Sequence, residues 1–257
     1  MLVLLSCAKT MSAVSKVKVP LTTSPRFQKE AAEIALQMSQ FSVDELERLL
    51  RVNAKIAVEN YKRYQAFHAE ATPELPALLA YTGIVFKRLN PKDFSAEDFG
   101  YAQEHLRLTS FCYGLLRPLD VIRAYRLEGD VVLPELGNQT LFSYWRSCLT
   151  DTVIEDIRSA GGILCNLASD EMKSLFDWKR VESEVRVVTP EFHVWKNGTL
   201  ATIVVYTKMS RGEMTRFILK NKIGNPEELK GFSWEGFEFD ESLSDERKLV
   251  FINGMGE

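Results

Sequence analysis

Short apolar runs along the chain predict the strands of a sheet. Residues 2–5 are apolar throughout, and they predict a buried strand at the start of the fold. A similar run at 162–169 predicts another. Asn197 and Gly198 separate two runs of β-branched and aromatic residues, which is typical of a β-hairpin. The run 200–206 is apolar at both alternating sets of positions, so it predicts a central strand covered on both faces. A last strand is expected at 249–252.

Apolar residues at helical spacing predict the helices. Ser24 followed by Pro25 is typical of a helix start, and the apolar stripe continues to residue 38. Ser42 and Glu45 have capping-box spacing, which predicts a second helix with a stripe running to Tyr64. The pattern indicates connecting segments over 70–94, and further helices over 95–110, 141–160 and 211–222 with a short one from Pro226.

The composition is that of an ordinary folded protein. The 257 residues are 46% hydrophobic, enough for a sizeable core, and neither a repeat nor a break in composition marks a domain boundary. We therefore expect a single domain over residues 1–257 with an α+β fold, in which helices surround a mixed β-sheet.

Charge is distributed unevenly although its sum is small. The formal net charge of -3 argues against a protein that binds polyanions with its whole surface. Residues 225–247 carry eight acids and two bases, whereas 1–29 carry five bases without an acid and 208–222 five bases with one acid. This asymmetry is compatible with a local basic face, and equally with solvated side chains in local ion pairs.

Cysteine and histidine positions give no support to a metal site. The four cysteines lack metal-ligand spacing and the three histidines are scattered, so we expect neither a metal nor a cofactor. The first residues lack the basic region and the long apolar run of an export signal, and no segment reaches the length of a membrane span. The sequence predicts a cytoplasmic protein that does not bind membranes.

The segment 206–217 is the best candidate site from the residues alone. Ser210 and Glu213 have capping-box spacing, which predicts a helix that begins at Arg211 directly after the apolar strand. Free backbone N–H groups at such a start, flanked by Lys208 and Arg211 and left accessible by Gly212, would bind a phosphate or another anion. Lys9, also after a predicted strand, would join them if both strands end at one edge of the sheet. The alternative is a strand-to-helix turn with solvated bases.

Four segments in a fixed order carry a resemblance to a known family. MLVLLSCAKT, LRLTSFCYGLLRPLDVIRAYRLE, CNLASDE and YTKMSRGEMTRFILKNK together resemble the YaaA family of bacterial peroxide-stress-resistance proteins over nearly the whole chain. Cys7 and Met209 stand where the family pattern has proline and lysine. The positions that match the family's motifs and that we take as candidate nucleic-acid-binding residues are Ser6, Lys9, Gly114, Arg117, Arg126, Lys208, Arg211 and Gly212.

The resemblance implies a basic cleft that binds DNA, duplex or branched and with little sequence specificity, and a role in limiting intracellular iron and oxidative DNA damage. It also implies a helix-hairpin-helix element. One candidate for this element is 112–128, where Gly114 and Pro118 force a turn and Arg117 and Arg126 would project towards phosphates with Tyr113 or Tyr125 against sugar or base. The other is 216–232.

Two further functions stay open at this point. One is an enzyme acting on nucleic acid or a nucleoside, with Lys9 or Lys208 as nucleophile or base. The other is direct iron sequestration by carboxylates of 225–247, against which the scattered histidines and cysteines argue. For Arg126 and Glu128, a buried ion-pair network with Asp120 is an alternative to DNA contact. We expect a monomer.

Overall fold

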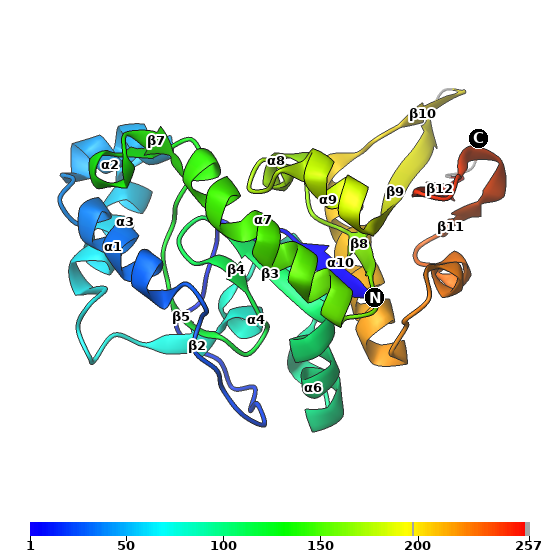
Figure 1. The fold of residues 1–257 in the computed structure, drawn as a ribbon, viewed down its shortest axis with the longest axis horizontal. Coiled ribbons are helices and arrows are strands. Elements are labelled where there is room, and N and C mark those ends of the chain that lie inside the picture. Colours follow the sequence, from blue (N-terminus) through cyan, green and yellow to red (C-terminus); the bar gives the residue numbers. More distant parts are fainter. Residues whose placement is uncertain (197, 255–257) are drawn as a thin grey trace.

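An eight-stranded mixed sheet forms the centre of the computed structural model, which describes residues 1–196 and 198–254 (Figure 1). Its main path runs in the order β11 (Phe237–Asp240), β12 (Lys248–Asn253), β9 (Arg186–Lys196), β8 (Ile163–Asn166), β1 (Leu2–Leu5), β3 (Leu106–Ser110) and β4 (Gly114–Leu116), with β10 (Thr199–Ala201) paired to β9. The strands from β12 to β3 are mutually parallel, whereas β4, β10 and β11 pair antiparallel.

The first strand lies at the middle of this sheet. Val3 pairs with Leu106 of β3 on one side and with Cys165 of β8 on the other. Residues Leu2–Leu5 are all buried, as their uninterrupted apolar sequence predicts. The carboxyl ends of β1, β3 and β8 therefore meet at one edge.

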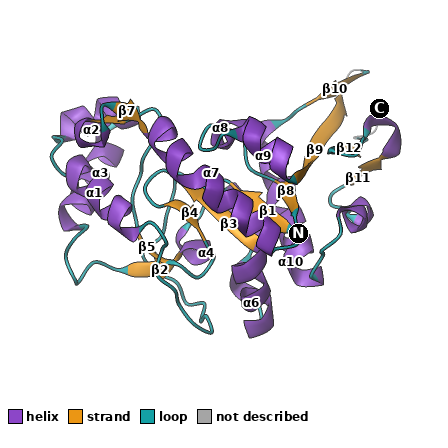
Figure 2. Ribbon diagram, viewed as in Figure 1, coloured by secondary structure: helices purple, strands orange, loops and turns teal. Residues whose placement is uncertain are grey.

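Helices cover the sheet, and a further group of helices lies beyond one end of it (Figure 2). They are α1 (Gln28–Met38), α2 (Val43–Leu50), α3 (Ala54–Ala66), α4 (Ala77–Ala80), α5 (Ile84–Leu89), α6 (Ala96–His105), α7 (Leu141–Ser159), α8 (Asp170–Lys173), α9 (Trp178–Glu184) and α10 (Val204–Asn221). In Figure 1, α7 crosses in front of the central strands, α10 lies behind them, and α1 to α3 gather at the far end. This arrangement confirms the expected mixed sheet surrounded by helices.

Short elements complete the chain. Two small antiparallel ladders pair β2 (Glu74–Pro76) with β5 (Val121–Arg123) and β6 (Val132–Leu133) with β7 (Gln139–Thr140). Four 3-10 helices are η1 (Pro91–Asp93), η2 (Pro134–Leu136), η3 (Pro226–Gly231) and η4 (Glu241–Leu243).

Several elements predicted from the sequence are confirmed. The strands β1, β8 and β12 and the long helix α7 agree with the expected ranges to within a few residues. The predicted capping box on Ser42 forms at the start of α2, and α6 begins after Ser95 as expected, with a capping box that was not predicted. Antiparallel pairing of Lys196 with Thr199 confirms the hairpin, while Asn197 of its predicted turn lies outside the described residues.

Three helix predictions need correction. The helix after Pro25 begins only at Gln28, because Thr23 is held in a bridge to the Asp120 segment. The predicted helix 42–64 is two helices, since Arg51 is left-handed and Asn53 caps a new start. The predicted helix 95–110 ends at His105, because 106–110 pairs with β1 as the buried strand β3.

The predicted central strand 200–206 is wrong. Only Thr199–Ala201 pairs, as an edge strand with β9, and α10 begins at Val204. The exposed fractions of the Val204 and Val205 side chains, 64% and 42%, show that these residues face solvent on the first turn of the helix. Their β-branched character is overridden by the packing of the rest of α10 against α5.

Of the two helix-hairpin-helix candidates, 112–128 is wrong. The turn at Gly114 joins the antiparallel strands β3 and β4, so no helix precedes it directly. In the second candidate, α10 ends at Lys222 in the left-handed region and the 3-10 helix η3 follows at Pro226. Its assignment as a helix-hairpin-helix stays a prediction.

Candidate functional site

A cavity of about 320 Å³ opens where the central parallel strands end. Its lining comes from the segments after β1, β3, β5 and β8, together with α5 and α10. Because β1 lies between β3 and β8 in the sheet, the chain segments that follow these three strands are neighbours. In open sheets with parallel strands, ligands bind in the crevice at such carboxyl ends. The fold therefore places a ligand-sized recess at the position where this architecture favours one.

Two lysines stand at the rim of this basic cavity. Lys9, in the segment after β1, has a side chain that is 57% exposed, and its Nζ donates to Glu128 Oε2 at 2.6 Å. Lys208, on the second turn of α10, is exposed and also lines the cavity. Among the residues that the structure describes, Lys208 forms no ion pair. Both ammonium groups are accessible to a large anionic partner.

Two arginines lie deeper in the cavity. The Arg126 side chain is only 16% exposed, and its Nη2 lies 3.5 Å from Glu128 Oε1. Arg211 is half-buried, and burial lowers the pKa of its guanidinium, with the charge of Asp170 opposing this shift. Asp170 pairs with Lys173 instead. Within the described residues, the buried Nε atoms of Arg126 and Arg211 have no hydrogen-bond partner. Such unpaired buried donors are costly and are normally satisfied by a partner.

Acidic groups compensate only part of this charge. Of the residues that line the cavity, one is acidic, the exposed Glu171. Glu128 lies next to the lining and is shared by Lys9 and Arg126. Four cationic side chains thus face two carboxylates, and the local field attracts anions although the whole chain is mildly acidic.

The remaining wall is largely apolar. It consists mainly of Ile84, Val85, Phe86, Phe111, Leu167 and Met172. Phe86 and Phe111 are buried, so their rings are fixed by the core around them. The cavity therefore combines recessed cationic groups with a rigid apolar surface.

Ser6 and Cys7 line the cavity, but their contacts serve the structure of the wall. Ser6 Oγ accepts a hydrogen bond from the Ser169 backbone N–H at 2.8 Å, which ties the segment after β1 to the segment after β8. Burial and the negative charge of Glu171 raise the pKa of the Cys7 thiol to about 12, so it is protonated at neutral pH. Cys7 is thus no ready nucleophile.

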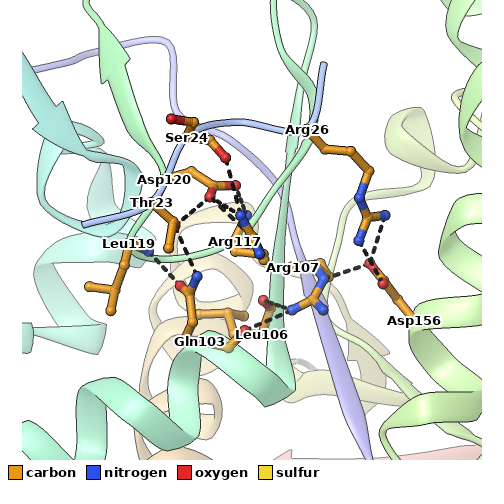
Figure 3. A network of polar contacts seen from close by, with 10 residues as sticks. All are labelled: Thr23, Ser24, Arg26, Gln103, Leu106, Arg107, Arg117, Leu119, Asp120 and Asp156. Carbon is orange, nitrogen blue, oxygen red and sulfur yellow. Dashed lines mark hydrogen bonds and ion pairs between the residues drawn. The ribbon is translucent and has the colours of Figure 1, made fainter. Parts of the chain in front are cut away.

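The other predicted contacts in 112–128 are internal. Tyr113 and Tyr125 are both buried; Tyr113 lies outside the cavity lining, whereas the Tyr125 side chain belongs to it and its hydroxyl bonds to Tyr81 and Ser110. Gly114 has a φ of 69°, and a Cβ there would lie 2.7 Å from the Trp145 ring. Arg117 lies outside the cavity and binds Asp120 and the Ser24 carbonyl (Figure 3). Asp120 therefore braces Arg117 rather than the Arg126 and Glu128 pair.

The predicted anion site at a helix start is also wrong. Because α10 begins at Val204, residues 208–212 lie inside the helix and their N–H groups are not free. Gly212 packs against α5, where a Cβ would lie 2.3 Å from the Val85 carbonyl oxygen. Lys208 and Arg211 nevertheless share one face of the helix at a spacing of three residues, and both line the same cavity as Lys9.

Sequence reasoning missed the part of the site that α5 supplies, whereas the pairing of Arg126 with Glu128 was one of its alternatives. The residues Gly83 to Phe86 lie in a segment expected to be a connection, and nothing in their sequence indicates a site. Ser169 and Glu171 fall within the segment CNLASDE, which was the available signal for them.

The described residues form neither a cluster of metal ligands nor a helix that could cross a membrane. They contain no group of three or more histidine, cysteine, aspartate or glutamate side chains placed to hold a metal ion. None of their helices combines the length and apolar character needed to cross a membrane.

Comparisons with known proteins agree on one family. Residues 1–243 match the family model described as peroxide stress protein YaaA. The chain is similar to a UPF0246 protein of Bacteroides thetaiotaomicron, with 98% identity over 100% of both chains. It is 77% identical to a UPF0246 protein of Bacteroides fragilis, again over 100% of both. A UPF0246 protein of Clostridium beijerinckii is 36% identical, over 99% of this chain and 98% of that protein.

Proposed function

The chain belongs to the peroxide stress protein YaaA family, and we propose that it acts in the stress response by binding DNA through its basic cavity. The observation that carries the proposal is the set of cations Lys9, Arg126, Lys208 and Arg211, of which two have unpaired buried donors. Limiting intracellular iron and oxidative DNA damage, which the resemblance implies, is part of the same proposal.

The surroundings of the cavity favour a polyanion. Residues 192–212 run from β9 through β10 into α10, and they contain Lys196, Lys208 and Arg211 but no aspartate or glutamate. Asp170, which pairs with Lys173, offsets only part of the effect of burial on Arg211, and a nearby phosphate would add counter-charge. Charge-assisted bonds between guanidinium and phosphate are strong and directional.

Contacts of this kind would give affinity without reading sequence. Lysine and arginine that reach phosphates fix position on a nucleic acid but distinguish no base. Each phosphate contact adds about 0.9 to the slope of log affinity against log salt for duplex DNA. If Lys9 and Lys208 each contact one phosphate, we expect this slope to be about -2 or steeper. Duplex and branched DNA should therefore both bind, and binding should weaken steeply with salt.

The test is a titration of fluorescently labelled duplex and branched DNA at low and moderate salt, followed by anisotropy. The variant Lys208→Glu should reduce affinity at least tenfold at low salt and lower the salt slope. Lys55→Glu is the matched control, because it makes the same charge change at another exposed lysine, on α3 and outside the cavity lining. Equal affinities of the two variants would contradict the proposal.

The geometry gives less support to the alternative function, an enzyme with a lysine nucleophile. An amine nucleophile needs a desolvated, unprotonated amine. Lys9 is engaged in an ion pair with Glu128, and Lys208 is exposed to water. The enzyme hypothesis therefore stays a hypothesis, and so does the expected monomer, which light scattering would check.

A further inference from the structure

The two lysines and the two arginines of the basic cavity differ in how far a partner must enter to reach them. Lys9, 57% exposed, is accessible from outside, whereas Arg126, 16% exposed, is accessible only through the cavity. In a base-paired duplex the phosphates lie on the outside of a stiff rod. Such a rod can place a phosphate at the rim but cannot bring one down to Arg126.

The apolar wall also exceeds what phosphate binding requires. Phe86, Phe111 and Met172 are buried side chains that line the same recess as the arginines. A phosphate gains nothing from them, whereas a nucleobase has an apolar face that packs on such surfaces. The volume of about 320 Å³ also falls within the range of roughly 300–1,000 Å³ that is usual for small-ligand sites.

We infer that the cavity receives one unpaired nucleotide of the bound strand, with its phosphate at Arg126 and Arg211 and its base against the apolar wall. This inference rests on the proposed function and names the feature of DNA that the site recognises. The phosphate oxygens would accept hydrogen bonds from the guanidinium groups of both arginines, which line the cavity. Lys9 and Lys208 would hold the neighbouring phosphates at the rim.

Binding of one nucleotide in the cavity can compete with binding of intact duplex at the rim only where unpairing that nucleotide costs little free energy. Extracting a paired base costs stacking and pairing energy, and that cost is least where a base is mismatched, bulged or in a single strand. The preferred ligand is therefore DNA with an unpaired position, and perfect duplex should bind through the rim alone.

The experiment compares two labelled DNA duplexes that differ by one bulged nucleotide, titrated by anisotropy. Wild type should bind the bulged duplex about tenfold more tightly, the equivalent of one favourable base contact. Placing 2-aminopurine at the bulge gives a second readout, because its fluorescence changes when the base leaves its neighbours and enters the cavity.

A cavity-filling variant separates the two parts of the site. Ile84→Trp adds bulk to a partly exposed position of the wall and leaves all four cations in place. It should abolish the preference for the bulge and the 2-aminopurine signal while retaining wild-type affinity for perfect duplex. The smaller change Ile84→Phe serves if the first variant does not fold, as judged by circular dichroism.

Each outcome decides a different claim. Equal wild-type affinity for the two duplexes, together with a loss of binding in Lys208→Glu, would overturn this inference and leave DNA binding by the rim standing. A bulge preference that survives both Ile84 variants would also overturn it, because the base would then bind elsewhere. Absence of wild-type binding to either duplex at low salt would overturn the proposed function itself.

Discussion

Arg107 of β3 and Asp156 of α7 form a nearly buried ion pair, with Nε of the arginine 2.7 Å from Oδ2 of the carboxylate. Their side chains are 9% and 11% exposed. Arg26 adds a second hydrogen bond to the same carboxylate at 3.0 Å, from the segment before α1 (Figure 3). Three segments far apart in the sequence are thus joined at one acidic group.

Replacing this acid should destabilise the fold strongly. The variant Asp156→Asn would leave the guanidinium of Arg107 buried without its counter-charge, which typically costs about 3–5 kcal/mol. Urea unfolding followed by circular dichroism measures the loss. Arg26→Gln is the control, since Arg26 is 43% exposed and its pair should contribute no more than about 1 kcal/mol. Similar losses of unfolding free energy in both variants would show that the buried pair of Arg107 and Asp156 is not the main source of the stabilisation.

Stability should fall in acid through Asp98 of α6. Burial disfavours its charged form, but hydrogen bonds from Lys222, Lys220 and Ser95 together lower its pKa well below the ordinary value of 3.8. The folded state thus binds the proton more weakly than the unfolded state. The stabilisation is complete above pH 3.8 and is lost as the pH falls towards the folded pKa.

The measurement is the free energy of unfolding in urea between pH 7 and pH 2. Asp98→Asn should be less stable than wild type at pH 7, and the difference should shrink in acid. Lys220 and Lys222 tie the end of α10 to α6 through this carboxylate. A difference independent of pH would mean that the ion pairs contribute nothing measurable.

Gly212 is required by close packing rather than by ligand access. An added Cβ would lie 2.3 Å from the Val85 carbonyl oxygen and 2.7 Å from Arg88 Cβ, so α10 and α5 would have to separate. We expect Gly212→Ala to lower the free energy of unfolding by about 1–3 kcal/mol. Gly100→Ala is the control in α6, where nothing lies within 4 Å, and it should stabilise by about 0.4–1 kcal/mol.

Three of the four cysteines should resist oxidants in the folded protein. Burial raises the pKa of Cys7 and Cys165 to about 12, and that of Cys112 further still. Thiolates are the reactive form, so these thiols should react with iodoacetamide or hydrogen peroxide more slowly than Cys148 of α7. Cys112 and Cys165 are also buried, whereas Cys7 is half-buried, as Cys148 is, and is protected by its raised pKa. Mass spectrometry after native labelling at pH 8 gives the order. Rapid modification of Cys7 would indicate a different environment.

The sequence predicted the elements whose apolar pattern is unambiguous. Leu2–Leu5 and α7 are long or uniform enough that only one structure suits them. The run 200–206 fails because a short apolar segment fits a strand and a helix equally well. What favours the helix is its packing on α5, which Gly212, six residues after the run, permits by its missing side chain. That contact is a property of the tertiary structure.

The sequence identified some of the residues that line the candidate cavity, but not how they come together. Lys9, Lys208 and Arg211 were expected together, and they line one cavity, although Lys208 and Arg211 reach it from within a helix rather than from its start. The roles of Glu128 and Ile84 depend on segments that meet only in the folded chain. A single sequence carries no signal for contacts between segments that are far apart along the chain.

The position of β1 sets an order for synthesis on the ribosome. This strand emerges first, but its partners are β3 and β8, whose residues Leu106 and Cys165 pair with Val3. An apolar strand that lacks both neighbours is prone to aggregate while it waits. The last lining residues, Lys208 and Arg211, emerge later still. The parallel core of the sheet therefore cannot form until both β3 and β8 have been translated, and the cavity is complete only after Lys208 and Arg211 have followed.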